Sequence, residues 1–82
     1  MELTIKLFGP PAQAVGSGCV MVSLPAHSPT CAALRVALME GRLELARLLP
    51  KCFFAVNHRY ATEEQELRAT DEIAIIGMVC GG

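Results

Sequence analysis

Apolar and polar residues alternate through the first part of the chain. The segment Leu3–Leu7 reads LTIKL, and a period of two places every second side chain on one face of a β-strand, against a core. We therefore predict a strand over residues 2–8. Gly9-Pro10-Pro11 ends this strand, and a loop is expected up to the glycines of residues 16–18. The run Cys19–Leu24 is rich in strand formers and predicts a second strand, paired with the first as a hairpin.

Residues 30–40 carry a helical pattern. Ser28 or Thr30 can cap the start of this helix, and Pro29 suits its first position. The apolar residues that recur at helical spacing are Cys31, Leu34 and Leu38. Gly41 is placed to end the helix.

The second half of the chain predicts shorter elements. A short helical stretch is expected over residues 45–49, ended by Pro50. Cys52–Val56 has the bulky composition of a strand, and Asn57–Arg59 is a plausible turn into a short edge segment at Tyr60-Ala61. A polar loop follows.

The last predicted strand, Ile73–Ile76, is apolar on both faces, which is typical of an interior strand that is paired in parallel. The order is strand, strand, helix, strand, short strand, strand. It predicts an α+β fold of the β-grasp (ubiquitin-like) type: a mixed sheet of about four to five strands packed on one main helix, with a flexible C-terminal Gly-Gly tail. By analogy with that fold, the first and last strands lie side by side in parallel. We expect a single domain over residues 1–82, with residues 77–82 as an extended tail.

Composition and charge exclude several classes of function. The chain has seven Lys and Arg residues and eight Asp and Glu residues, which gives a net charge of −1. The basic residues are scattered along the sequence, so nucleic acid is not an expected partner. The start of the chain lacks the pattern of a secretory signal. The longest apolar run, Ile73–Cys80, is far shorter than the roughly 20 residues of a membrane span. We expect a cytoplasmic protein that does not cross a membrane.

A chain of 82 residues is too small to form a deep pocket beside a full core, so an enzyme acting on its own is not expected. Its four cysteines lack the paired spacing of a metal site, and no metal is expected. Cys19, Cys31 and Cys52 are interpreted as small apolar core residues. His27, His58 and the acidic pair Asp71-Glu72 are interpreted as surface residues without a chemical role.

The C-terminus carries the strongest functional signal. The apolar run continues through Met78, Val79 and Cys80 into Gly81-Gly82. At about 3.3 Å per extended residue, residues 77–82 reach roughly 20 Å, enough to enter another protein's active site. Glycine has no Cβ, so it passes through a narrow channel and leaves the last carbonyl open. Exposed Met78 and Val79 would lower solubility unless a partner covers them, which favours a docked tail.

The chemistry available to this terminus is limited by the carboxylate of Gly82, which resists nucleophilic attack. Adenylation by ATP on a separate enzyme converts it into a mixed anhydride. Sulfide equivalents then replace the adenylate and leave a C-terminal thiocarboxylate, a better nucleophile than the carboxylate. This route predicts a sulfur carrier.

The chain resembles the ubiquitin-like sulfur-carrier family that includes the small subunit of molybdopterin synthase and the sulfur carrier of the thiamine pathway. The resemblance runs through most of the chain. The residues that carry it are Leu7-Phe8, Gly16 at the end of the first loop, the capped helix, Ala55-Val56-Asn57, Asp71-Glu72-Ile73-Ala74 and Gly81-Gly82.

This resemblance implies that Gly82, preceded by Gly81, is adenylated by an E1-like activating enzyme. A cysteine desulfurase or sulfurtransferase would supply the sulfur. The thiocarboxylate would then enter the large subunit of molybdopterin synthase and donate sulfur for the dithiolene of molybdopterin. ATP and magnesium belong to the activating enzyme, and no cofactor is expected on this chain.

The resemblance also implies a partner surface. An apolar patch near the first and last strands maps to Phe8 and Ile76, whose alternative interpretation is ordinary sheet residues. In the tail, Met78, Val79 and Cys80 are expected to contact the partner. Cys80 has two interpretations: a thiol that attacks the activated terminus or pairs with a donor sulfur, and a small residue that fits the channel.

Two positions depart from the family pattern. Gly77-Met78 stands where relatives usually have a proline pair, so a less stiff exit and a larger entropic cost of docking are expected. Pro10-Pro11 stands where relatives often continue toward a helical segment. Three alternatives remain open: a sulfur carrier for thiamine, cysteine or another thiolated product, a ubiquitin-like modifier joined to lysines, and a binding domain whose tail does no chemistry.

Overall fold

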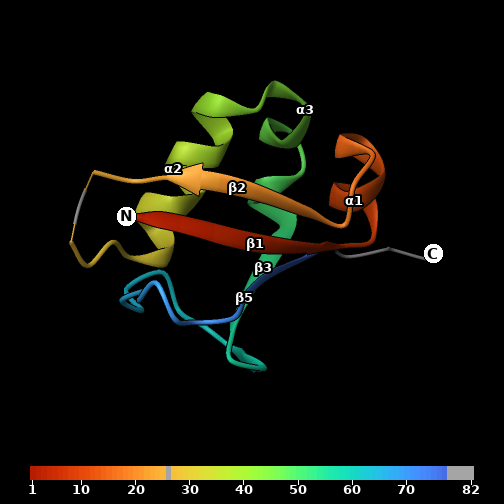
Figure 1. The fold of residues 1–82 in the computed structure, drawn as a ribbon. Helices are drawn as coiled ribbons and strands as arrows, with labels where there is room; N and C mark the ends of the chain where they lie inside the picture. The colour runs from red at the N-terminus through yellow and green to blue at the C-terminus, as the bar shows by residue number, and fades with distance from the viewer. Residues whose placement is uncertain (26, 78–82) are drawn as a thin grey trace.

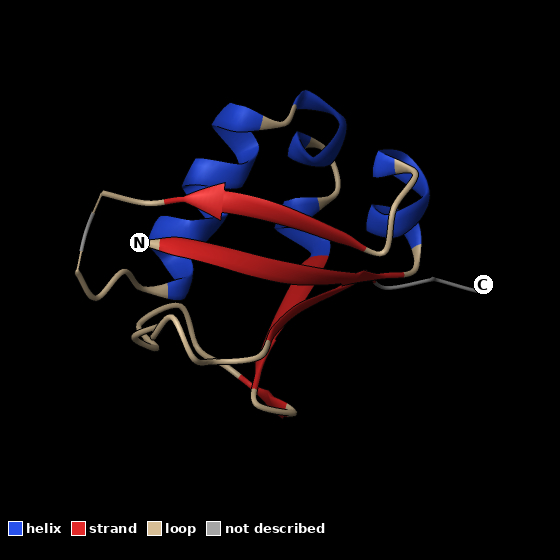
Figure 2. Ribbon diagram, viewed as in Figure 1, coloured by secondary structure: helices blue, strands red, loops and turns tan. Residues whose placement is uncertain are grey.

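A mixed sheet with helices on one face forms the architecture of the chain in a computed structural model, which describes residues 1–25 and 27–77 (Figures 1 and 2). In this part of the chain the strand order is β2-β1-β5-β3-β4. The strands are β1 (Glu2–Phe8), β2 (Cys19–Ser23), β3 (Cys52–Val56), β4 (Arg59–Tyr60) and β5 (Ile73–Gly77). The prediction of a ubiquitin-like β-grasp is confirmed.

The first and last strands lie side by side in the middle of the sheet, as predicted. β1 and β5 run parallel, with Ile5 opposite Ile73 and Phe8 opposite Ile76, while β2 and β3 flank them in antiparallel pairing. The apolar residues of β5 fit this central place: Ile73 and Ile75 are buried under the helices, while Ala74 and Ile76 are half-buried on the other face.

The main helix, α2 (Cys31–Gly41), covers the inner face of the sheet. The hydroxyl oxygen of Thr30 accepts a hydrogen bond from the Ala33 backbone N–H at 3.2 Å, which caps the first turn as predicted. Its buried face is the predicted one: Cys31, Leu34 and Leu38 are at most 1% exposed. They pack against the inward-facing residues of β1, β3 and β5.

The connection after β1 is helical, and the prediction of a loop was wrong. α1 (Pro10–Val15) begins with both prolines in its first turn, where a backbone N–H has no partner within the helix, so proline costs nothing there. Gly16 ends α1 at φ 79°, and its N–H donates to the carbonyl of Ala12 at 2.8 Å. The same residues that end the strand therefore also start a helix.

The segment after α2 forms two short turns in place of one stretch ended by Pro50. These are α3 (Leu43–Ala46) and the 3₁₀ turn η1 (Leu49–Lys51). Pro50 lies within the first turn of η1, because proline is tolerated wherever its missing N–H needs no acceptor. Leu45 and Leu49 are fully buried.

Arg35 joins α2 to η1 and β3. Its guanidinium donates to the carbonyl oxygens of Leu49 and Cys52 and to Glu63 Oε1 at 2.8 Å, and it stacks 4.7 Å from the centre of the Phe54 ring. A planar cation with several donors satisfies carbonyls that the short turns leave without helical partners. The side chain of Arg35 is 19% exposed, so solvent screens these contacts only partly.

The three cysteines in the described part of the chain divide into two groups. Cys31 and Cys52 are buried, and burial is the main cause that raises the pKa of both thiols, so both are protonated at neutral pH. The prediction that Cys19 belongs to the core was wrong. It is exposed and lies opposite Lys6 on the outer face of the sheet, a position that depends on the register of β2 and not on composition.

No helix in the described part of the chain is long and apolar enough to cross a membrane.

Candidate functional site

The candidate site lies where β5 ends. Gly77 was predicted to begin the tail, but it is the last residue of β5 and pairs with Cys52 of β3. It belongs to the strand because β3 extends far enough to pair with it. The predicted site residues beyond it, Met78, Val79, Cys80, Gly81 and Gly82, lie outside the described residues.

An apolar row crosses the outer face of the sheet one residue before this end. Ile76 of β5 lies between Phe8 of β1 and Phe53 of β3. Phe8 is 51% exposed and Phe53 is 47% exposed, because the helices cover only the opposite face. The structure thus brings together the two predicted patch residues, Phe8 and Ile76, and adds Phe53.

Tyr60 extends this row toward the sheet edge. Its ring meets that of Phe53 edge to face, with ring centres 5.7 Å apart. We call Phe8, Phe53, Tyr60 and Ile76 the outer patch. Phe53 and Tyr60 were missed because membership depends on the pairing of β3 with β4 and β5, and the all-apolar run Cys52–Val56 does not show which of its side chains face outward.

The outer patch borders a shallow hollow of about 450 Å³ with a charged margin. Glu72 Oε2 lies 3.5 Å from Lys6 Nζ and 3.2 Å from His58 Nε2. All three side chains are at least 42% exposed, so these contacts contribute little to stability. The arrangement is an apolar floor with a polar rim, the usual composition of a protein interface.

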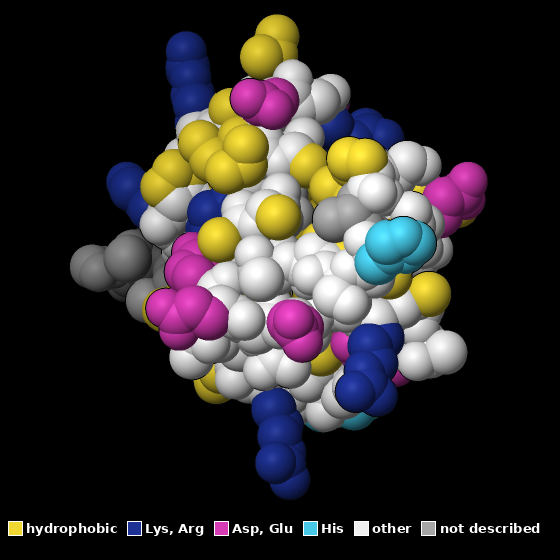
Figure 3. Space-filling view, turned by 90° about the vertical axis from the view of Figure 1, so that its left-hand side faces the viewer, with side chains coloured by type: hydrophobic (Ala, Val, Ile, Leu, Met, Phe, Trp, Pro, Cys, Tyr) yellow, Lys and Arg dark blue, Asp and Glu magenta, His cyan; other side chains and the backbone are white. Residues whose placement is uncertain are grey.

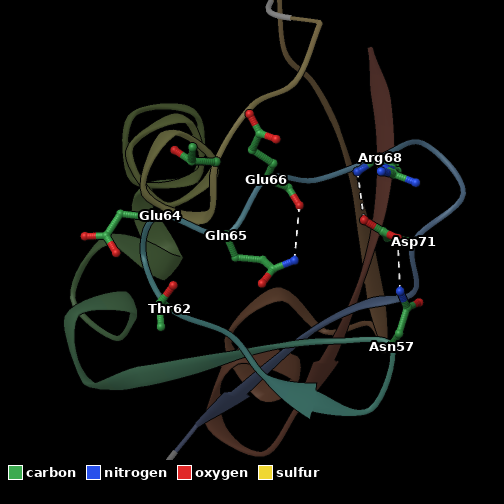
Figure 4. Close-up of a pocket in the computed structure, with 8 residues that line it drawn as sticks. Asn57, Thr62, Glu64, Gln65, Glu66, Arg68 and Asp71 are labelled. Atoms are coloured by element: carbon green, nitrogen blue, oxygen red, sulfur yellow. Dashed lines mark hydrogen bonds between the residues drawn. The ribbon is translucent and has the colours of Figure 1, made fainter.

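A second, larger hollow of about 720 Å³ is polar and lies beside the loop that precedes β5 (Figure 4). Asp71 accepts hydrogen bonds from the Asn57 side-chain amide at 3.0 Å and from the Arg68 backbone N–H at 2.8 Å. The Asn57 side-chain oxygen accepts from the Glu72 backbone N–H at 2.9 Å. These groups satisfy one another and hold the loop to the turn of Asn57 and His58, whose φ angles are positive. The hollow is therefore a structural feature of the loop.

Substitution Asp71→Asn tests this chain of hydrogen bonds through its pH dependence. The Arg68 N–H, and then the Asn57 amide, hold the pKa of Asp71 below its usual value. A carboxyl with a lowered folded-state pKa stabilises the fold above its unfolded pKa of about 4, and this stability is lost as the pH falls through the folded pKa. In urea unfolding, wild type is expected to be more stable than Asp71→Asn at neutral pH, with the difference vanishing in acid.

Glu64→Gln is the matched control for this measurement, because the Glu64 side chain points away from the hydrogen-bonded groups (Figure 4). The free energy of unfolding of Glu64→Gln should stay close to that of wild type at every pH. An Asp71→Asn difference that stays constant from neutral pH into acid would contradict the assignment.

The remaining charged groups in the described part of the chain bear on whether it has a further site. On the end of the molecule drawn in Figure 3, Lys and Arg side chains stand apart from one another. Among residues 1–25 and 27–77, no group of three His, Cys, Asp or Glu residues is placed to hold a metal ion. His27 is exposed. Within residues 1–25 and 27–77, the outer patch and its charged margin are therefore the candidate site.

Comparison with known proteins gives this arrangement a context. A model of the ThiS family matches residues 5–82. The crystal structure of SAMP1 from Haloferax volcanii is similar with a TM-score of 0.83 and 24% identity over 100% of each chain. A putative molybdopterin converting factor, subunit 1, from Pyrococcus furiosus has a TM-score of 0.80 and 18% identity, over 96% of this chain and 99% of that one.

A chain in the complex of subunits 1 and 2 of the molybdopterin-converting factor from Helicobacter pylori gives a TM-score of 0.68 and 23% identity over 100% of each chain. No curated protein matches the sequence. At these identities the solved structures establish the shared fold.

Proposed function

The chain belongs to the ThiS family, and from this premise we propose that it carries sulfur on its C-terminal Gly82 as the small subunit of a molybdopterin synthase. The observation that carries the proposal is the extent of the family match, which runs from residue 5 to residue 82 and so includes Gly81-Gly82. The chemistry of a terminal carboxylate then specifies what the carrier does.

The proposed cycle begins with attack of the Gly82 carboxylate on the α-phosphate of ATP. An acyl-adenylate forms and pyrophosphate leaves, with ATP and magnesium held by an E1-like enzyme. Hydrosulfide, released by a thiol reductant from the persulfide of a cysteine desulfurase or sulfurtransferase, then attacks the acyl carbon and displaces AMP. The product is a C-terminal thiocarboxylate, and the sulfur is transferred in the active site of a large subunit.

The outer patch supports this cycle as the docking surface for both partners. Phe8, Phe53 and Ile76 lie on the face of the sheet that no helix covers, one residue before the end of β5. A partner seated there holds the domain while Gly82 reaches its active site. One of the similar structures is a complex of subunits 1 and 2 of the molybdopterin-converting factor from Helicobacter pylori. This favours a large subunit as one partner.

A second candidate is a protein modifier, because solved structures of small archaeal modifier protein 1 share this fold over nearly the whole chain. In that function the acyl-adenylate of Gly82 is attacked by a lysine amine and an amide bond forms. Both candidates need the same activation of Gly82 and the same free glycines. They differ in the nucleophile that follows.

Intact-mass spectrometry distinguishes the candidates. The purified chain is incubated with its activating enzyme, magnesium, ATP and a sulfur donor whose activity is proven on a control carrier, and the C-terminal peptide is then sequenced. Replacement of one oxygen by sulfur on Gly82 is the expected result. An unchanged Gly82, together with lysine-linked conjugates of the chain in cells, would replace the carrier with the modifier.

The pathway is tested by the acceptor. The thiocarboxylated chain, mixed with a molybdopterin synthase large subunit and the pterin precursor, should yield molybdopterin. Transfer only to an acceptor of the thiamine or cysteine pathway would keep the sulfur carrier and change the product.

A further inference from the structure

The closest approach at the end of β5 is made by the two prolines of α1. A Cβ built on Gly77 would lie 2.5 Å from Pro11 Cδ and 3.0 Å from Pro10 Cδ. The first distance is far inside van der Waals contact, and the atoms belong to rings that cannot rotate away. Gly77 does not have a positive φ, so glycine is required here for space and not for backbone conformation.

The local sequence explains how α1 reaches this position. Phe8, the last residue of β1, lies opposite Ile76, and Gly9 then turns the chain with φ 76°. α1 therefore begins level with Gly77, in the place where a longer β1 would have continued. Pro11 is buried, and α1 packs against β1, β5 and α3.

β3 also holds Gly77 in place. Cys52 of β3 pairs with it, and a small hollow of about 60 Å³ beside it is lined by Pro10, Leu48 and Lys51. The strand thus leaves the domain between β3 and a wall of two proline rings. This differs from the loosely held exit that Gly77-Met78 predicted in the sequence.

We propose that Pro10 and Pro11 are positioning residues that brace Gly77 and fix the direction of the backbone where β5 ends. The consequence for catalysis rests on the proposed function of Gly82. Gly82 follows Gly77 by five residues, which span at most about 17 Å, so a partner that holds these residues extended receives Gly82 from the direction set at Gly77. Misplacement of a reacting group by about 1 Å can cost about 100-fold in rate.

The test compares Gly77→Ala, Pro11→Ala and the double variant in adenylation by the activating enzyme. Gly77→Ala should lower kcat by about 10- to 100-fold while KM changes by less than about twofold, because the outer patch that docks the domain is intact. The double variant removes the nearer of the two rings that the new methyl group meets and leaves Pro10 Cδ at 3.0 Å. It should recover most of the kcat that Gly77→Ala loses.

Val20→Ala is the control for a loss of stability alone. Val20 is buried on β2, which β1 separates from β5, so this variant should unfold at a lower temperature and keep its kcat. The proposal fails if Val20→Ala loses as much kcat as Gly77→Ala, or if Gly77→Ala keeps wild-type kcat. It also fails if adding Pro11→Ala to Gly77→Ala restores none of the lost kcat.

A measurement on the isolated chain tests the brace without the reaction. In Pro11→Ala the backbone order parameter of the Gly77 amide should fall from the rigid value of about 0.85 toward about 0.6. An unchanged value would overturn the brace even in a chain whose Gly82 is activated. Failure of wild type to be adenylated would instead overturn the proposed function and leave this result standing.

Discussion

Deletion of Gly82 is expected to abolish thiocarboxylate formation and leave the folded domain as stable as before. The carboxylate of the deleted chain would stop one residue short of the adenylating site. Every buried apolar side chain in the described part of the chain lies between Leu3 and Ile75, so the core loses no contact. A loss of 1 kcal/mol would shift Tm by about 4–8 °C in a domain of this size, and we expect a shift below about 1 °C.

The measurement pairs intact-mass spectrometry with thermal unfolding of the deletion and of wild type. Gly82→Ala serves as the matched variant, because it keeps the length of the chain and adds one methyl group next to the reacting carbonyl. It should react slowly, between wild type and the deletion. A deletion that is still converted, or one that unfolds many degrees earlier, would contradict the proposed role of Gly82.

The alternation of apolar and polar residues predicted most of the sheet and its central helix. Thr30 and the spacing of Cys31, Leu34 and Leu38 are local signals, and local signals determine a cap and a buried helix face. The apolar character of Ile73–Ile76 indicated the central parallel strand, because continuous apolar runs are typical of strands with neighbours on both sides.

The misplaced elements share a physical cause, which is that one residue type serves two purposes. Pro10 and Pro11 end a strand and begin a helix equally well, since the missing N–H interrupts a strand ladder but costs nothing in the first turn of a helix. Pro50 is likewise compatible with the end of one turn and the start of the next. Cys19 is apolar enough for a core, and only the register of β2 places it outside.

The sequence predicted two of the four residues of the outer patch, Phe8 and Ile76, and missed the other two. Gly81-Gly82 is visible in the sequence, whereas Phe53 and Tyr60 join Phe8 only after β3 pairs with β4 and β5. The contact of Gly77 with Pro11 joins residues near opposite ends of the chain. No pattern along the sequence reports such a distance.

Substitution Phe8→Asp is expected to weaken binding to both partners by about 30-fold or more, the effect of losing a central apolar contact of about 2 kcal/mol at an interface. Phe8 is half exposed on the outer patch, so a carboxylate there remains hydrated in the free domain and loses water only when a partner covers it. The domain should remain folded.

Met21→Asp is the matched control, because Met21 is 63% exposed on the same face of the sheet but opposite Thr4 on the β2 edge. Both variants place an aspartate at an exposed strand position, so their costs in strand propensity are similar. Calorimetric titration against the activating enzyme and the large subunit should show less than about a threefold change for Met21→Asp. Equal weakening by the two variants would mean that the whole sheet face, and not the row beside the end of β5, forms the docking surface.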